Sequence, residues 1–129
     1  KGRDGQSLEK LFFARFKEID RLTKHNEVNQ RDISVLKRVL GKTLNKYGIV
    51  KYDAFDDVGG KLSFALAMLD ENNTGFILNA IHSRDNCFLY IKEIVKGESY
   101  IMLSGEEIDA LRQAVSMDDA MELLGDEEV

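Results

Sequence analysis

Residues 47–70 of this chain read YGIVKYDAFDDVGGKLSFALAMLD, and this stretch decides the fold. Within it the hydrophobic pattern changes from the three- and four-residue spacing of a helix to the alternation of β-strands. It also contains three neighbouring carboxylates, Asp53, Asp56 and Asp57, followed by the Gly59-Gly60 pair. The stretch therefore divides the sequence into a helical arm, residues 1–47, and a body, residues 48–129.

The composition is that of a globular domain with an appended arm: of 129 residues, 43% are hydrophobic and 32% are charged. The single cysteine, Cys87, excludes an intramolecular disulfide and a cysteine-rich zinc site. Charge is unevenly spread, because residues 1–48 carry 12 Lys/Arg against 6 Asp/Glu, whereas residues 49–129 carry 6 against 17. This asymmetry indicates that the arm meets an acidic surface: a membrane, a nucleic acid or the body of another copy.

The arm has apolar residues at helical spacing. They are Leu8, Leu11, Phe12, Phe16, Ile19 and Leu22, then Ile33, Leu36, Val39, Leu40, Leu44 and Tyr47 after a polar middle. We expect one continuous helix over about residues 8–46, ended by Gly48, because neither glycine nor proline lies between Gly5 and Gly41. A helical hairpin that turns near residues 25–29 is the alternative.

A helix of this length needs something to cover its apolar stripe, and a second copy is the simplest partner. The residues that we expect to form the dimer contact are Leu8, Phe12, Phe16, Ile19, Ile33, Leu36 and Leu40. In that dimer Asn26, in the polar middle, would set the register. Packing of the stripe on the chain's own sheet is the other possibility.

The body has an α+β pattern. Residues 49–55, 62–69, 76–83 and 87–95 are predicted strands, and residues 99–103 are a predicted short fifth strand. The connections are too short for crossover helices, so we expect an antiparallel meander of four to five strands. Small residues alternate with large ones from Ser63 to Ala67, which predicts a helix close against the small face.

C-terminal helices complete the predicted body. Ser104 and Glu107 form a capping box, which starts a helix that continues to about Ser116. Asp118 is the expected cap of a last short helix that continues to Leu124.

Two clusters are candidate ligand sites. The first contains Asp53, Asp56, Asp57, Gly59 and Gly60, where carboxylates could hold a hard cation or a nucleotide and the glycines would admit a ligand to the backbone. Its spacing fits neither an EF-hand nor a phosphate-binding loop, and Asp and Gly also dominate ordinary turns.

The second cluster is His82 with Arg84 and Asp85, the minimum for acid–base chemistry, but no catalytic triad accompanies it. Cys87 alternates with Leu89 and Ile91 and is predicted to be a small core residue. We therefore assign no catalytic residue, no metal ligand and no cofactor, and we expect a protein that is not an enzyme.

The basic residues of the arm are spread around the predicted helix with acidic residues between them. Neither a recognition-helix pattern nor an aromatic stacking platform accompanies them, so the sequence favours a solvated helix face over a nucleic-acid site. DNA association through the arm stays a weaker alternative.

The chain resembles the domain of unknown function 4446 family, small bacterial proteins found mainly in Firmicutes. The matching residues are Gly5–Glu9, Gly48–Gly60, Ser63–Ala67, Leu69, Asp70, Gly75, Arg84, Gly97–Tyr100 and Leu103–Glu107. The resemblance implies an N-terminal membrane helix, a helical spacer and this domain, and it implies no known activity. Because the sequence starts at Lys1 rather than Met, we expect a membrane anchor upstream.

Taken together, the sequence predicts a non-enzymatic module on the cytoplasmic face of the cell membrane. We expect it to dimerise through the arm and to bind a partner protein. The fragment itself is expected to be soluble, because no apolar run approaches the roughly 20 residues of a membrane span. A metal- or nucleotide-binding domain that uses Asp53, Asp56 and Asp57 is the alternative.

Overall fold

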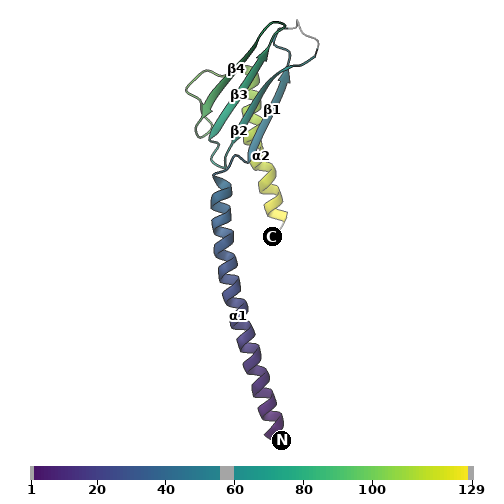
Figure 1. The fold of residues 1–129 in the computed structure, drawn as a ribbon, viewed down its shortest axis with the longest axis vertical. Coiled ribbons are helices and arrows are strands. Elements are labelled where there is room, and N and C mark those ends of the chain that lie inside the picture. The colour runs from purple at the N-terminus through teal and green to yellow at the C-terminus, as the bar shows by residue number, and fades with distance from the viewer. Residues whose placement is uncertain (1, 56–59, 128–129) are drawn as a thin grey trace. The chain divides into compact units, whose positions relative to one another are not determined.

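The computed structural model describes residues 2–55 and 60–127 (Figure 1). The chain divides into two units, residues 1–39 and residues 40–129. Helix α1 (Gly2–Gly41) is followed by strands β1 (Lys46–Tyr52), β2 (Ser63–Leu69), β3 (Gly75–His82) and β4 (Cys87–Ile94), and then by helix α2 (Gly105–Glu127). The strands form one antiparallel sheet in the order β1-β2-β3-β4, which confirms the predicted α+β meander.

Helix α1 is continuous, as predicted, and the helical hairpin that would turn near residues 25–29 is not formed. Its large apolar side chains are between 42% and 68% exposed. Its ion pairs, such as Lys24 with Asp20 at 3.2 Å, are also exposed, so each adds little to the stability of the helix. The apolar stripe predicted from the sequence is therefore an uncovered surface of α1.

The end of α1 differs from the prediction. The helix ends at Gly41, whereas Gly48 lies inside β1. Two side chains replace the missing helical donors at this end, because Thr43 Oγ1 and Asn45 Nδ2 both donate to the Leu40 carbonyl, at 2.6 and 3.0 Å. The helix therefore ends at Gly41 rather than Gly48, and the Thr43 and Asn45 side chains satisfy one of its last carbonyl groups.

The core lies between the sheet and α2. In β2, Ser63, Ala65, Ala67 and Leu69 are all buried, so the small face predicted to lie under a helix does so. Ala110 and Ala114 of α2 are fully buried in the same cluster, together with Ile77 and Ile94. Small residues on both sides let the helix axis approach the sheet closely.

Gly48 is the closest point of this contact. A Cβ atom at this position would lie 2.0 Å from the Ala110 carbonyl oxygen and 2.9 Å from the Ala114 nitrogen. Side chains of α2 also accept hydrogen bonds from backbone N–H groups of β1: Gln113 Oε1 from Ile49 at 3.1 Å and Met117 Sδ from Tyr47 at 3.2 Å. Helix α2 therefore packs on β1 and also satisfies donors of that edge strand.

The C-terminal region is one helix rather than the two predicted, because α2 continues from Gly105 to Glu127. Asp118 lies within it and does not begin a new helix. Instead, its carboxylate accepts a hydrogen bond at 2.8 Å from Nζ of Lys46, a side chain that is only 1% exposed. Asn73, in the turn between β2 and β3, accepts a second hydrogen bond from the same Nζ. This buried lysine thus ties together β1, the turn and α2.

The predicted fifth strand over residues 99–103 is absent. The chain after β4 forms only one bridge, Val95 with Glu98, around a tight turn in which Lys96 and Gly97 both have positive φ angles, 52° and 80°. A hydrogen bond from the Gly97 nitrogen to the Asn73 carbonyl oxygen, at 2.8 Å, joins this turn to the one between β2 and β3. Residues beyond Glu98 leave the sheet and lead to α2 (Figure 1).

We predict that Gly48→Ala lowers the free energy of unfolding by about 3 kcal/mol, because the added methyl group forces α2 away from β1. Urea denaturation followed by far-ultraviolet circular dichroism measures this change. Gly105→Ala is the matched control, since a Cβ there meets nothing within 4 Å. Equal stability of the two variants would show that the approach of α2 to Gly48 is not a tight constraint.

Candidate functional site

The first predicted ligand cluster is only partly described by the structure. Asp56, Asp57 and Gly59 lie outside the described residues. Asp53 follows the end of β1 and is half-buried, and Gly60 is exposed with a φ of 90°. Within residues 2–55 and 60–127, no group of three or more His, Cys, Asp or Glu side chains is placed to hold a metal ion.

The second predicted cluster lies where β3 ends and β4 begins. His82 is the last residue of β3, is half-buried, and its backbone nitrogen donates to Ser63 Oγ at 2.9 Å. Arg84 is exposed in the turn that follows. Cys87, directly opposite His82 in the register, is exposed, so its prediction as a core residue was wrong. Its strand alternates as expected, but the face on which Cys87 lies is not the one that α2 covers.

That uncovered face is the largest feature that the sequence reasoning missed. Residues of the sheet that alternate with the buried set project away from α2, and we call this surface the open face. It consists of Tyr47, Ile49, Lys51, Phe64, Leu66, Met68, Phe76, Leu78, Ala80, His82, Cys87, Leu89, Ile91 and Glu93. Most of these side chains are apolar, which is unusual for a sheet face that no helix of the body covers.

The centre of the open face is one row across all four strands. The register places Ile49 beside Leu66, Leu66 beside Leu78, and Leu78 beside Ile91. At the outer strands these side chains are well exposed, 44% for Ile49 and 69% for Ile91. Leu89, the next residue on this face of β4, is 66% exposed. The row is therefore a continuous apolar surface rather than a set of isolated hydrophobic residues.

Charge on the open face is confined to two opposite corners. Lys51 lies at one end of edge strand β1, and Glu93 lies at the other end of edge strand β4. The interior of the face, as far as the structure describes it, is uncharged. This arrangement, apolar in the middle and charged at the rim, is typical of protein-binding surfaces.

A sequence signal for the open face exists. In residues 62–69 the large residues alternate with the small ones, so both faces of β2 are apolar. A strand with two apolar faces belongs to a sheet that is covered on both sides. The body provides one covering helix, α2, and this mismatch between apolar faces and covering helices is the signal.

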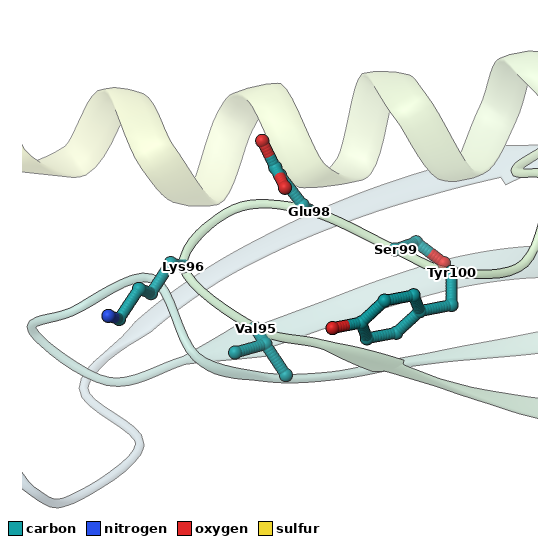
Figure 2. Close-up of a pocket in the computed structure, with 5 residues that line it drawn as sticks. All are labelled: Val95, Lys96, Glu98, Ser99 and Tyr100. Carbon is teal, nitrogen blue, oxygen red and sulfur yellow. The ribbon is translucent and has the colours of Figure 1, made fainter.

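A second surface feature lies on the turn after β4. A hollow of about 310 Å³ is lined by Val95, Lys96, Glu98, Ser99 and Tyr100. Figure 2 shows the Tyr100 ring and the Val95 side chain on one side of the chain, with the Glu98 carboxylate pointing the other way. Tyr100 is 98% exposed. Ser99 fixes the backbone here, because its Oγ accepts a hydrogen bond from the Ile101 nitrogen and donates to the Ile101 carbonyl oxygen.

The start of α2 is fixed by a buried ion pair. Glu107 is fully buried, and its Oε1 accepts hydrogen bonds at 2.8 Å from Lys92 Nζ on β4 and from the Ser104 backbone nitrogen. The Glu107 nitrogen in turn donates to Ser104 Oγ, at 3.2 Å, which completes the predicted capping box. Lys92 also donates to the Met102 carbonyl oxygen, so the segment that leads from the turn into α2 is held at two points.

The pKa of Glu107 reflects these contacts. Burial alone would raise the pKa of this carboxyl, but the hydrogen bonds from Lys92 and Ser104 outweigh burial and lower the pKa below its ordinary value of 4.5. Elsewhere in the same layer, burial raises the pKa of Tyr52, whose hydroxyl donates at 2.7 Å to Asn79 Oδ1. These polar groups lie on the α2 side of the sheet and do not contribute to the open face.

The fold is that of a small α+β domain that follows a long N-terminal helix. A family model described as protein of unknown function (DUF4446) matches residues 1–115. The chain therefore belongs to this family. Neither a curated protein nor a solved structure matches the chain. Within the described residues, no helix combines the length and the apolar composition that crossing a membrane requires.

We predict that Glu107→Gln lowers the free energy of unfolding by about 3 kcal/mol at pH 7, because Lys92 loses the carboxylate that balances its charge. Since the folded pKa of Glu107 lies below 4.5, the pair stabilises the fold above that pH and loses its effect as the pH falls through the folded pKa. Thermal unfolding between pH 7 and pH 3 measures this.

The stability difference between Glu107→Gln and the parent chain should therefore shrink toward pH 3. Asp109→Asn, an exposed change in the same helix, is the control and should alter stability little at any pH. A difference that stays constant over the whole range would contradict the role of the Glu107 charge.

Proposed function

We propose that this chain is a non-enzymatic, cytoplasmic module of a membrane-tethered bacterial protein. In this proposal α1 pairs two copies, and the open face of the sheet binds a partner protein. The tether and the cytoplasmic location rest on the resemblance to the family, whose members combine a membrane helix, a helical spacer and this domain. Partner binding rests on the open face.

The main support is the size and continuity of the apolar surface. The row from Ile49 to Ile91, together with Leu89, Tyr47 and the large residues of β2 and β3, is apolar area that binding would remove from water. Burial of apolar area is worth roughly 25 cal/mol per Å². Contiguous apolar patches of this kind mark interaction sites, whereas single exposed hydrophobic residues do not.

The partner that fits best is an amphipathic helix of another protein. On the opposite face, α2 shows how this sheet accepts a helix, with its axis over β1 and β2. The outer strands of a four-stranded sheet lie about 14 Å apart, which is enough for the roughly 10 Å diameter of a helix. Lys51 and Glu93 at the corners would contact polar groups at the edges of such a helix.

The open face also argues for binding rather than catalysis. Acid–base or nucleophilic chemistry needs polar side chains that converge on one point. The described polar groups with buried partners, such as Lys46, Glu107 and Asn79, lie on the α2 side, where they hold the fold together. The surface offered to a partner is mainly hydrocarbon and aromatic.

We predict that a photoreactive amino acid in place of Ile91 cross-links one defined protein in cells that make the full-length protein. Because binding would bury this side chain at the centre of the row, Leu89→Lys in the same chain should abolish the adduct. Mass spectrometry of the adduct identifies the partner and the segment that is cross-linked. A helical segment with apolar residues at three- and four-residue spacing is the expected result.

The matched control is the same photoreactive amino acid in place of Arg112, an exposed residue of α2 on the other side of the sheet. It should give no such adduct. Adducts that are the same at both positions, or adducts that survive Leu89→Lys, would rule out the open face as the binding surface.

A further inference from the structure

The apolar residues of helix α1 follow a seven-residue repeat. With the positions of each heptad written a to g, the a positions are Phe12, Ile19, Asn26, Ile33 and Leu40. The d positions are Leu8, Arg15, Leu22, Asn29 and Leu36. All ten lie within the continuous helix, and the apolar ones are exposed. Apolar residues at a and d are the signature of a coiled coil.

A second repeat of the same period supports this assignment of the heptad positions. Position f is basic in five successive heptads: Lys10, Lys17, Lys24, Arg31 and Arg38. In a two-stranded coiled coil, f is the position farthest from the partner helix, so these charges stay in water. Neighbours in the row are about 10.5 Å apart along the helix. This exceeds the Debye length of about 8 Å at physiological salt, so their mutual repulsion is weak.

We propose that α1 pairs with α1 of a second copy as a parallel, in-register, two-stranded coiled coil. This proposal rests on the dimerisation stated above and adds to it the orientation, the register and the strand number. β-branched Ile19 and Ile33 at a, with Leu22 and Leu36 at d, favour two parallel strands. A single Asn at an a position, here Asn26, specifies the same state by hydrogen bonding to its symmetry mate.

The length of the helix selects the parallel orientation. An antiparallel dimer can give both Asn26 and Asn29 a polar partner only if Asn26 faces Asn29 of the second copy. In that register Phe12 would face residue 43 and Leu8 would face residue 47, both beyond the end of α1 at Gly41. The apolar first two heptads would then lack a helical partner. A parallel, in-register dimer instead pairs every a and d position with its own counterpart.

Two flanking pairs agree with the parallel register, whereas a third pair near the N-terminus, Asp4 with Glu9, opposes it with like charges. In that geometry a g residue faces the e residue five positions later in the second copy. Asp32 at g then faces Lys37 at e, which gives two opposite-charge pairs by symmetry. Leu11 at g faces Phe16 at e, which widens the apolar seam near the N-terminus. In the antiparallel register Phe16 would instead face Lys37. The contact between Asp32 and Lys37 and the contact between Leu11 and Phe16 would then both be lost.

Polar residues in the seam lower stability and increase specificity. Arg15 at d is directed toward Glu18 of its own helix, with Nη1 at 3.6 Å from Oε2, so its charge is partly balanced beside the seam. Asn26 and Asn29 form two adjacent polar layers in the middle of the helix. Any shift of one strand along the other would place these layers against Ile or Leu, and this penalty fixes the register.

Disulfide trapping in the full 129-residue chain tests the proposal. Cys87, which is exposed, is first changed to Ser, and Gly5→Cys then places a thiol at an a position, where a Cβ meets nothing within 4 Å. In a parallel, in-register dimer the two thiols face each other and oxidise to a disulfide. In the antiparallel register they would be at least about 50 Å apart. Ser34→Cys, at the outward b position, controls for random collision.

We expect Gly5→Cys to lose its monomer band on a non-reducing gel after mild oxidation, while Ser34→Cys keeps it. Light scattering on the reduced proteins gives the mass independently. A dimer in solution without the Gly5→Cys cross-link would overturn the parallel register but keep arm dimerisation. A monomer would overturn both, and a trimer or tetramer would overturn the two-stranded assembly.

Discussion

The close contact between α2 and the sheet is the constraint on which the body depends. Gly48 has no side chain because the backbone of α2 occupies that space, with the Ala110 carbonyl oxygen and the Ala114 nitrogen in contact range. Ala65 and Ala67 continue the same shallow surface in the neighbouring strand. A helix that lies this close leaves no room for large side chains at Gly48, Ala65 and Ala67. The large residues that alternate with them in β2, Phe64, Leu66 and Met68, project to the other face, where they contribute to the open face.

Two ion pairs, each with one fully buried partner, fix α2 along the sheet. Lys46 with Asp118 and Lys92 with Glu107 join the helix to strands β1 and β4, which are the two edges of the sheet. Such pairs add little net stability, because the buried partner must leave water. Their geometric demand is strict, however: a shift of the helix by one turn would replace Glu107 beside Lys92 by a residue without a carboxylate. Small residues thus set the distance of α2 from the sheet, and the ion pairs set its position along it.

Local patterns predicted most of the fold because they have local causes. The capping box at Ser104 and the alternation from Ser63 to Leu69 are fixed by neighbours in the chain, and both are confirmed. Among the predictions that were wrong are the end of the first helix at Gly48 and the fifth strand over residues 99–103. Gly48 fits a helix end equally well in sequence, and only the approach of α2 explains its place in β1. Residues 99–103 have a strand composition, but after the Val95–Glu98 bridge the segment leads to α2 instead of pairing.

The candidate site was harder to predict than the fold, for a physical reason. Carboxylates and glycines attract attention in a sequence, but they also form turns, and of the first cluster only Asp53 and Gly60 lie in the described part. The open face has no motif, because it consists of ordinary strand residues such as Leu66, Leu78 and Ile91. The alternation in residues 62–69 indicates two apolar faces in one strand, but the extent of the open face across all four strands requires the register and the position of α2.

The seam of α1 and the open face differ in a way that favours different partners. In the proposed coiled coil, the seam contains polar layers at Asn26 and Asn29, and Asp32 pairs with Lys37 under two-fold symmetry, so we expect the seam to select its own copy. The open face has no polar layer in its interior, and its charges, Lys51 and Glu93, lie at the corners. Such a surface gains affinity from area, and the rim alone provides orientation. We therefore propose that self-association through the arm and binding of a different protein through the sheet are separable, and we expect a change in one surface to leave the other intact.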